Sequence, residues 1–366
     1  MNALPPLAVS ATLFEPLTLR SVTLRNRIVL SPMAQYSAAD GMANDWHFVH
    51  YASRAAGGLG AVVVEVTAVS PQGRICPGEL GLWQDEQVAP LARLAALIAA
   101  QGAVAGIQIG HAGRKACTAR PWEGGAAVPL DRGGWIPLGP GTEPFGPAYH
   151  APRALVQAEL EALPGIFAAA ARRAHQAGFR LLELHGAHGY LIHQFLSPLV
   201  NQRADAYGGP FENRARLALE VTRAVRAAWP AELPLWVRLS ATDWAAGGWD
   251  VDEAVRLAGL LRDEGVDLVD SSSGGVVAYQ RIPTAPGFQV PFAERIRREA
   301  GVRTGAVGLI TEPAQADAIL RAGQADVVLL GRVMLREPYW PLHAAHALGV
   351  EGPWPVQYLR GAPGTA

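Results

Sequence analysis

The sequence predicts an α/β fold consisting of a single (β/α)8 TIM barrel, and three observations favour this architecture. Short β-branched runs alternate eight times with longer periodic helices, which is typical of a parallel sheet built from repeated strand–helix units. The 366 residues show no break in composition that would mark a second domain. No Gly-x-Gly-x-x-Gly pattern opens the first unit, as an open dinucleotide-binding sheet would require. We therefore predict one barrel domain over residues 1–366.

The barrel elements follow one another along the chain. Apolar runs of strand length predict strands at 28–30, 61–66, 104–109, 179–184, 235–239, 268–271, 303–307 and 327–330. Residues with helical periodicity predict helices between them, among them those at 88–100, 160–177, 212–228, 252–264, 291–300 and 313–322.

Two segments fall outside the repeat. Residues 14–27 contain two short alternating pieces around Arg20 and Ser21, which predict a hairpin that plugs the amino-terminal end of the barrel. Residues 112–158 follow the third strand, are rich in Gly, Pro and Trp, and are too long for an ordinary connection. Because barrel active sites lie at the carboxyl ends of the strands, we expect this segment to cap the pocket.

Composition excludes several classes of protein. The net charge of −1, from 31 basic and 32 acidic residues, does not predict a nucleic-acid surface. The sequence contains no run of eighteen apolar residues, so it predicts no membrane span. Residues 1–19 contain no Lys or Arg, with which a secretory leader would begin. Two cysteines are too few for a disulfide framework. The sequence therefore predicts a cytoplasmic protein.

Residues 185–190, His-Gly-Ala-His-Gly-Tyr, follow the fourth predicted strand and form the first candidate site. Two imidazoles and a phenol at one strand end suit a reaction in which negative charge develops on a carbonyl oxygen. The same spacing also fits half of a metal site or hydrogen-bonded core histidines. The motif alone leaves these alternatives open.

Other polar residues at strand ends predict a cofactor-sized site. Gly331-Arg332 follows the eighth strand, where such barrels commonly bind phosphate, although a tight turn with a solvated arginine fits equally. Arg238 closes the fifth strand and needs an anionic partner, either a cofactor or an internal acid such as Asp243 or Glu183. The amide of Gln108 suits the edge of a heterocycle or a backbone group.

Several motifs occur in a recognisable order. They are LRNRI at 24–28, SPM at 31–33, HAGRK at 111–115, HGAHGY at 185–190, FLSPL at 195–199, NQR at 201–203, YGG at 207–209, ENR at 212–214 and GR at 331–332. With these motifs the chain resembles the Old Yellow Enzyme family of FMN-dependent ene reductases, in particular its thermophilic-like branch. The resemblance covers about residues 13–360.

The resemblance implies a function and a set of site residues. NADPH would reduce bound FMN, which would then reduce the C=C bond of enones, enals or maleimides in a ping-pong cycle. His185 and His188 would bind the substrate carbonyl, Tyr190 would donate the proton, and Tyr36 would face the substrate. The implied contacts to FMN are Ser31, Pro32, Met33, Ala34, Val66, Gln108, Arg238, Gly305, Gly331 and Arg332.

The resemblance also concerns the tail at 350–366. It implies a homodimer or homotetramer in which Arg360 reaches the neighbouring active site, whereas a chain end without that resemblance is usually frayed. The chain departs from the branch at Ala34, where a cysteine is usual. A competing hypothesis is a metal-dependent barrel hydrolase that uses His185, His188 and possible help from His111, although the first strand end offers it no strong ligand.

Overall fold

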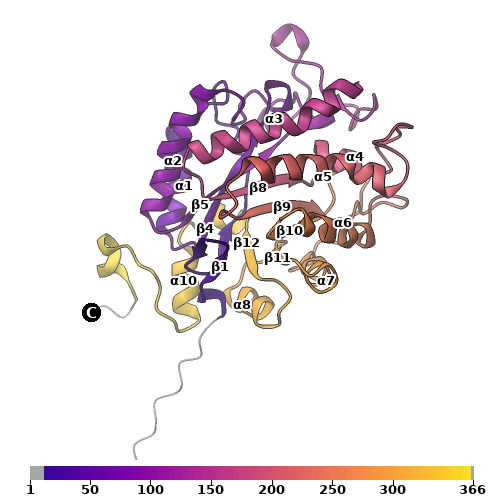
Figure 1. Ribbon diagram of the computed structural model, residues 1–366. Helices are drawn as coiled ribbons and strands as arrows, with labels where there is room; N and C mark the ends of the chain where they lie inside the picture. Colours follow the sequence, from indigo (N-terminus) through magenta and orange to yellow (C-terminus); the bar gives the residue numbers. More distant parts are fainter. Residues whose placement is uncertain (1–11, 364–366) are drawn as a thin grey trace, which may run out of the picture.

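The computed structural model describes residues 12–363, and its centre is a closed barrel of eight parallel strands (Figure 1). The strands lie in the order β3, β4, β5, β8, β9, β10, β11 and β12, so each pairs with its neighbour in the chain and the last closes onto the first. Their bounds are Ile28–Leu30, Ala61–Ala68, Val104–Gly110, Leu181–Gly186, Leu235–Ser240, Leu268–Ser272, Arg303–Ala306 and Val327–Leu330. The predicted barrel is confirmed.

Helices surround the barrel (Figure 1). They are α1 (Asp45–Ala56), α2 (Val88–Ala100), α3 (Gln157–Gln176), α5 (Phe211–Ala228), α6 (Val251–Asp263), α7 (Val290–Ala300), α8 (Pro313–Arg321) and α10 (Trp340–Ala347), with the short α4 (Leu191–Leu196) and α9 (Arg332–Arg336). In α2 the side chains of Leu91, Leu94 and Ile98 are buried because their spacing of three and four places them on one face. No helix within residues 12–363 combines the length and apolar composition needed to cross a bilayer.

The predicted hairpin is present as β1 (Leu17–Leu19) and β2 (Val22–Leu24), which pair antiparallel. Arg20 at the turn donates from Nε to Asp267 at 2.7 Å and from Nη2 to the carbonyl of Gly265 at 3.2 Å. Ser21 donates to the carbonyl of Glu232 at 2.7 Å. Because these partners lie in the loops that lead into β9 and β10, the hairpin covers the amino-terminal end of the barrel.

The fourth barrel strand differs from its prediction in a way that affects the site. It begins at Leu181, because the backbone N–H of Phe179 bonds to the Ala174 carbonyl and closes the end of α3. The strand continues to Gly186, and His185 pairs with Arg238 of β9. His185 is therefore part of the sheet, where its ring is held more firmly than in a loop.

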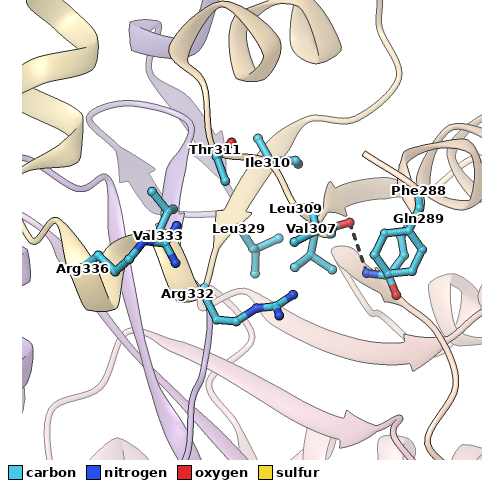
Figure 2. A pocket seen from close by; sticks show the side chains of 12 residues that line it. Phe288, Gln289, Val307, Leu309, Ile310, Thr311, Leu329, Arg332, Val333 and Arg336 are labelled. Carbon is cyan, nitrogen blue, oxygen red and sulfur yellow. Dashed lines mark hydrogen bonds between the residues drawn. The ribbon is translucent and has the colours of Figure 1, made fainter. Parts of the chain in front are cut away.

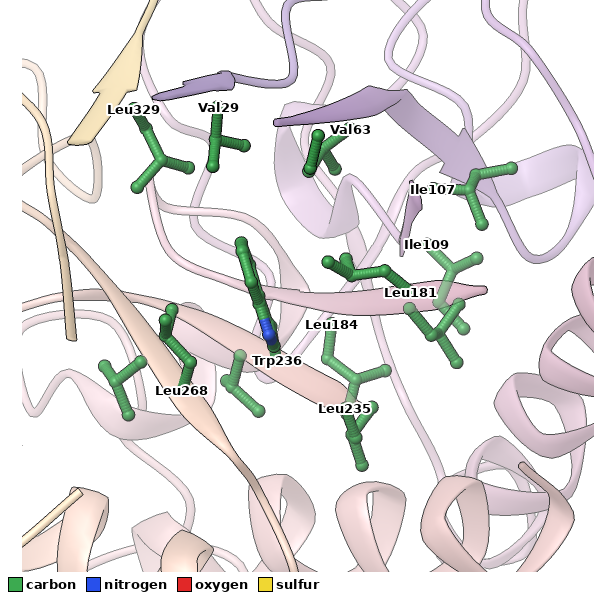
Figure 3. Packing of buried hydrophobic residues seen from close by; sticks show 14 of the residues in the cluster. Val29, Val63, Ile107, Ile109, Leu181, Leu184, Leu235, Trp236, Leu268 and Leu329 are labelled. Carbon is green, nitrogen blue, oxygen red and sulfur yellow. The ribbon is translucent and has the colours of Figure 1, made fainter. Parts of the chain in front are cut away.

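The barrel interior is apolar at its amino-terminal level. Figure 3 shows Trp236 reaching from β9 toward Val29, Val63 and Leu329 on the opposite wall. Trp236 is fully buried. The next inward positions along the strands carry polar side chains, so the apolar level forms a floor beneath them.

Residues 112–158 leave the barrel after β5 and carry little regular structure. They contain the short 3-10 helices Gly113–Lys115, Pro121–Glu123 and Leu130–Arg132, and the two-residue strands β6 (Leu138–Gly139) and β7 (Arg153–Ala154), which pair with each other.

Candidate active site

The loop after β8 packs directly against the loop after β10. Gly189, with φ of +72°, lies so close to this second loop that a Cβ there would sit 2.0 Å from the Gly275 carbonyl oxygen. Lys115 Nζ bridges both loops, since it donates to the carbonyls of His188 at 2.8 Å and Gly275 at 3.0 Å. Only glycine permits this close backbone approach, which fixes the position of His188.

The imidazoles of His185 and His188 face each other. His185 Nε2 lies 3.3 Å from His188 Nδ1, while His188 Nε2 lies 2.7 Å from Ser272 Oγ. Burial, followed by the positive charge of Arg238, holds the pKa of each imidazole well below its ordinary value. Both rings are therefore neutral, and each carries a single N–H proton.

The surrounding hydrogen bonds assign those two protons. His185 Nδ1 accepts from the Ala187 N–H at 3.2 Å, so the proton of His185 resides on Nε2. The 3.3 Å contact between the rings is a hydrogen bond from His185 Nε2 to His188 Nδ1, so His188 carries its proton on Nε2 and donates it to Ser272 Oγ. Ser272 in turn donates to Gln289 Oε1 at 3.4 Å, so one chain of hydrogen bonds sets the tautomers of both rings.

Tyr190 lies beside this pair. Its ring centroid is 4.8 Å from that of His185, with an interplanar angle of 83°. Burial raises the pKa of the phenol well above its ordinary value, so the phenol stays protonated. Lys115 Nζ lies 5.1 Å from the centroid of the Tyr190 ring.

A cavity of about 450 Å³ adjoins Tyr190. Tyr36, Tyr149 and Tyr190 line it with Lys115, and its remaining lining residues are Ile75, Thr118, Ala119, Pro121, Gly124 and Gly125. Most of these residues belong to the segment 112–158. This segment therefore forms much of the cavity wall, and it brings Tyr36 and Tyr190 to one space.

Below the imidazoles, two predicted cofactor contacts are held by buried acids. Gln108 Nε2 donates to Glu183 Oε1 at 2.7 Å, so its partner is a side chain and not the backbone considered from sequence. Arg238 Nε lies 3.0 Å from Asp270 Oδ2. The alternative of an internal ion pair is therefore present, but its acid is Asp270 and not Asp243 or Glu183, because the register of β9 and β10 places Asp270 opposite Arg238. Asp243 instead accepts a hydrogen bond from Ser197, and its Oδ1 lies 2.8 Å from His193 Nε2.

A second cavity, of about 230 Å³, lies beside Gly331 (Figure 2). Figure 2 shows the side chain of Arg332 extending toward Phe288 and Gln289, and Arg336 also lines the cavity. None of the described residues that line it is acidic. Two guanidinium groups around a space without acids fit a phosphate group, as FMN would bring.

The predicted FMN contacts after β3 lie next to this cavity. The Ser31 N–H bonds to the Leu330 carbonyl at 3.0 Å, which ties the loop 31–34 to the end of β12. Met33 Sδ lies 3.6 Å from where a Cβ on Gly331 would stand. Pro32 and Ala34 belong to the same loop. Val66 comes to face His185 because a bulge in β4 adds a residue between Val64 and Thr67.

Gly305 does not line the cavity. A Cβ at this position would stand 2.3 Å from Leu329 Cδ1, so the glycine makes room for core packing. Gly308, with φ of +119°, lines the cavity instead and was not singled out from sequence. Ser272, Asp270 and Arg336 were also missed as partners. Ser272 stands in a conspicuous run of serines at a strand end, but its partner could be identified only from the fold.

Arg360 lies in an exposed 3-10 helix, Val356–Gly361, and lines neither of these two cavities of its own chain. The tail packs on the barrel through Tyr358, whose ring centroid is 5.9 Å from that of Tyr339. Residues 1–11 and 364–366 lie outside the described part of the chain. Predictions made for the first nineteen residues and for the tail at 350–366 concern them in part.

The hypothesis of a metal-dependent hydrolase finds no ligand set. Across residues 12–363, no three His, Cys, Asp or Glu side chains converge as metal ligands. His111 Nδ1 accepts a hydrogen bond from the Gly113 N–H at 3.0 Å, and the nitrogens of His185 and His188 are engaged as described above.

Comparison with known proteins decides the family. Residues 12–351 match the NADH:flavin oxidoreductase / NADH oxidase family. The chain belongs to this family. It is 48% identical to an NADPH dehydrogenase of Geobacillus thermodenitrificans over 355 residues, which cover 96% of this chain and 99% of the relative. An NADPH dehydrogenase of Listeria innocua is 45% identical over 350 residues, which cover 95% and 98% of the two chains.

Solved structures of family members share the fold. Morphinone reductase matches with a TM-score of 0.77 and 28% identity, over 93% of this chain and 90% of that chain. The Old Yellow Enzyme homologue from Zymomonas mobilis matches with a TM-score of 0.77 and 26% identity, over 97% and 99%. The resemblance to the Old Yellow Enzyme family is confirmed, and the protein is an FMN-dependent NADPH oxidoreductase.

Proposed function

We propose that this oxidoreductase reduces the C=C bond of α,β-unsaturated carbonyl compounds such as enones, enals and maleimides. The observation that carries the proposal is the pair of neutral imidazoles whose nitrogens His185 Nε2 and His188 Nδ1 face each other, with a protonated phenol beside them. When bound, FMN supplies the redox chemistry, because it takes a hydride from NADPH and passes it to the alkene in a ping-pong cycle.

His185 and His188 bind the substrate oxygen in this proposal. A substrate oxygen that enters between the rings accepts from His185 Nε2 and from His188 Nδ1, once the Ser272 hydroxyl turns to donate to His188 Nε2 and the His188 proton moves to Nδ1. These bonds strengthen as the oxygen gains enolate character, so they lower the barrier as well as assist binding. Neutral imidazoles suit this role because they donate without giving up their protons.

Tyr190 is the proton donor to Cα. Its raised pKa keeps the proton on the phenol until a strongly basic carbon develops next to it. Tyr36 lines the same cavity and orients the substrate. The residues proposed to hold FMN are Ser31, Pro32, Met33, Ala34, Val66, Gln108, Arg238, Gly331 and Arg332, with the phosphate at Gly331 and Arg332.

The replacement Tyr190→Phe tests the proposed chemistry. We expect alkene reduction to slow by about 10²- to 10⁴-fold, the usual contribution of a general acid, while NADPH still reduces the flavin. Stopped-flow absorbance measures the two half-reactions separately. Tyr207→Phe is the matched control, because its hydroxyl bonds to Glu220 at 2.9 Å, away from the site. Equal losses in both half-reactions of the Tyr190 variant would remove Tyr190 as the acid.

We also propose that the protein is a homodimer or homotetramer in which Arg360 enters the neighbouring active site. The exposure of Arg360 and the absence of its side chain from the two described cavities of its own chain support this arrangement. Mixing an Arg360→Ala variant with a Tyr190→Phe variant tests it, because mixed oligomers then regain intact sites. Activity that stays at the sum of the separate variants would contradict it.

The proposed location is the cytoplasm, and activated alkenes rather than nucleic acids are the proposed partners. Both cysteines are free thiols, Cys76 and Cys117, as expected in a reducing compartment. Cell fractionation followed by flavin fluorescence of the fractions measures the location.

A further inference from the structure

Two buried acids lie beneath the imidazole pair and are not used by the proposed chemistry. Strand register places Glu183 of β8 beside Gln108 of β5, and Asp270 of β10 beside Arg238 of β9. Both acids are fully buried, and Gln108 and Arg238 are almost fully buried. We call these four residues the polar cluster. Glu183 lies in register with Trp236, whereas Arg238 and Asp270 lie one inward position further along β9 and β10.

Each acid holds one of the proposed FMN contacts. Glu183 Oε1 accepts from Gln108 Nε2 at 2.7 Å, which turns the amide oxygen of Gln108 away from Glu183. Asp270 Oδ2 lies within ion-pair distance of Arg238 Nε, at 3.0 Å, although neither oxygen of Asp270 accepts a well-aligned hydrogen bond from a described residue. Arg238 likewise donates no such bond within the described chain, so its guanidinium remains available to a ligand.

The charges of the polar cluster do not balance if both acids are ionised. One guanidinium faces two carboxyl groups, and a second buried carboxylate without a cation would be expensive. Glu183 Oε2 is buried without a partner among the described residues, whereas Asp270 has the ion pair. Burial, and then the charge of Asp270, raises the pKa of Glu183, so Glu183 is the acid that keeps its proton.

The other groups around Glu183 do not provide a second cation. Arg238 and Asp270 face it from β9 and β10, and Gln108 faces it from β5. His185, two residues along the same strand, is neutral. Across the barrel the walls present Val29, Val63 and Leu329, which do not titrate (Figure 3).

We infer that Asp270 and Glu183 are positioning residues for bound FMN. Asp270 holds the guanidinium of Arg238 in place. Glu183 holds the amide of Gln108 in place, and its own carboxyl group is protonated. The inference rests on the proposed placement of FMN against Gln108 and Arg238. Its consequence is that the charge beneath the flavin depends on pH. Loss of the Glu183 proton adds a negative charge there, which disfavours the addition of electrons to FMN.

The midpoint potential of the holoenzyme, measured from about pH 6 to about pH 9, tests this inference. We expect the potential of the unmodified protein to fall more steeply where Glu183 loses its proton. Glu183→Gln keeps the hydrogen bond to Gln108 but cannot become charged. At the alkaline end, its equilibrium constant for flavin reduction should exceed that of the unmodified protein about tenfold, which corresponds to about 30 mV for two electrons.

Two further variants make the result decisive. Asp270→Asn removes the charge that helps to raise the pKa of Glu183, so the steeper part of the curve should move to lower pH, which provides a test if Glu183→Gln does not fold. Arg238→Met should weaken FMN binding, measured by recovery of flavin fluorescence. Superimposable curves for the unmodified protein and the two acid variants would overturn the inference. If Arg238→Met also left FMN affinity and potential unchanged, the proposed placement of FMN would fall with it.

Discussion

Removal of the Ser272 hydroxyl should weaken binding of the substrate oxygen, although Ser272 acts on that oxygen only through His188. Ser272 Oγ lies 2.7 Å from His188 Nε2, and in the proposed substrate complex it donates to that nitrogen, so that the proton of His188 resides on Nδ1, the nitrogen that faces His185. In Ser272→Ala this preference disappears, and His188 can present a bare nitrogen to the ligand. A buried hydrogen bond contributes roughly 0.5–1.5 kcal/mol, and 1.4 kcal/mol is tenfold in affinity, so we expect binding to weaken about 2- to 10-fold.

The assay is titration of the oxidised holoenzyme with a phenol, whose flat oxyanion imitates an enolate, followed by the absorbance of the flavin. Ser272→Thr keeps the hydroxyl and should restore the dissociation constant to within about twofold of the original value. A variant that lost affinity only through looser packing would not be rescued in this way. If the Ser272→Ala variant bound the phenol as tightly as the unmodified protein, the assignment of the His188 proton in the complex would be refuted.

Three further predictions follow from the structure. Gly305→Ala should lower the free energy of unfolding by about 1–3 kcal/mol in chemical denaturation, because the new methyl group meets Leu329, and Leu329→Val in the same chain should recover part of the loss. Ala34→Cys should raise the midpoint potential of FMN by about 20 mV if the thiol donates a hydrogen bond of about 1 kcal/mol, and an unchanged potential would count against this contact. Burial raises the pKa of Glu65 to about 8, so the folded protein holds this proton to a higher pH than the unfolded chain, and the free energy of unfolding falls as the pH rises from the ordinary Glu pKa to about 8. Glu65→Gln should reduce this fall by roughly 2–4 kcal/mol, measured by urea denaturation at several pH values. If the free energy of unfolding changed with pH equally in the variant and the unmodified protein, the role of Glu65 would be contradicted.

The barrel could be predicted from the sequence because its signals are local. The helix predicted at 88–100 has the bounds of α2, since an amphipathic run of that length has few alternatives. Where a tertiary contact decides the boundary of an element, the predicted and observed boundaries differ. Phe179 has a side chain typical of strands, yet its backbone closes the end of α3, and the strand moved two residues toward His185. Helix α1 was missed because its start depends on the Asn44 cap and its face mixes His with aromatic residues.

The candidate residues could be found at strand ends, but their partners could not. Arg238 was expected to need an anionic partner, and the choice of Asp270 depends on the order and register of the barrel strands, which no local pattern encodes. The same holds for Ser272 and His188, which are 84 residues apart. Glycines were ambiguous for another reason: Gly305 and Gly308 look alike in sequence, and only the packing of Leu329 separates a core position from a cavity wall.

Tyr36 and His188 share an unusual backbone, with φ of +52° and +58°. A non-glycine residue in this left-handed region costs about 1–3 kcal/mol, so its surroundings must hold it there. The carbonyl of His188 accepts from Lys115, and the carbonyl of Tyr36 accepts from Arg120 at 2.8 Å. Both cations come from the segment 112–158, which thereby acts as a brace on two strained residues. Anyone who exchanges this segment to obtain a new substrate range would have to retain both anchors, or both residues would relax and carry their side chains out of place.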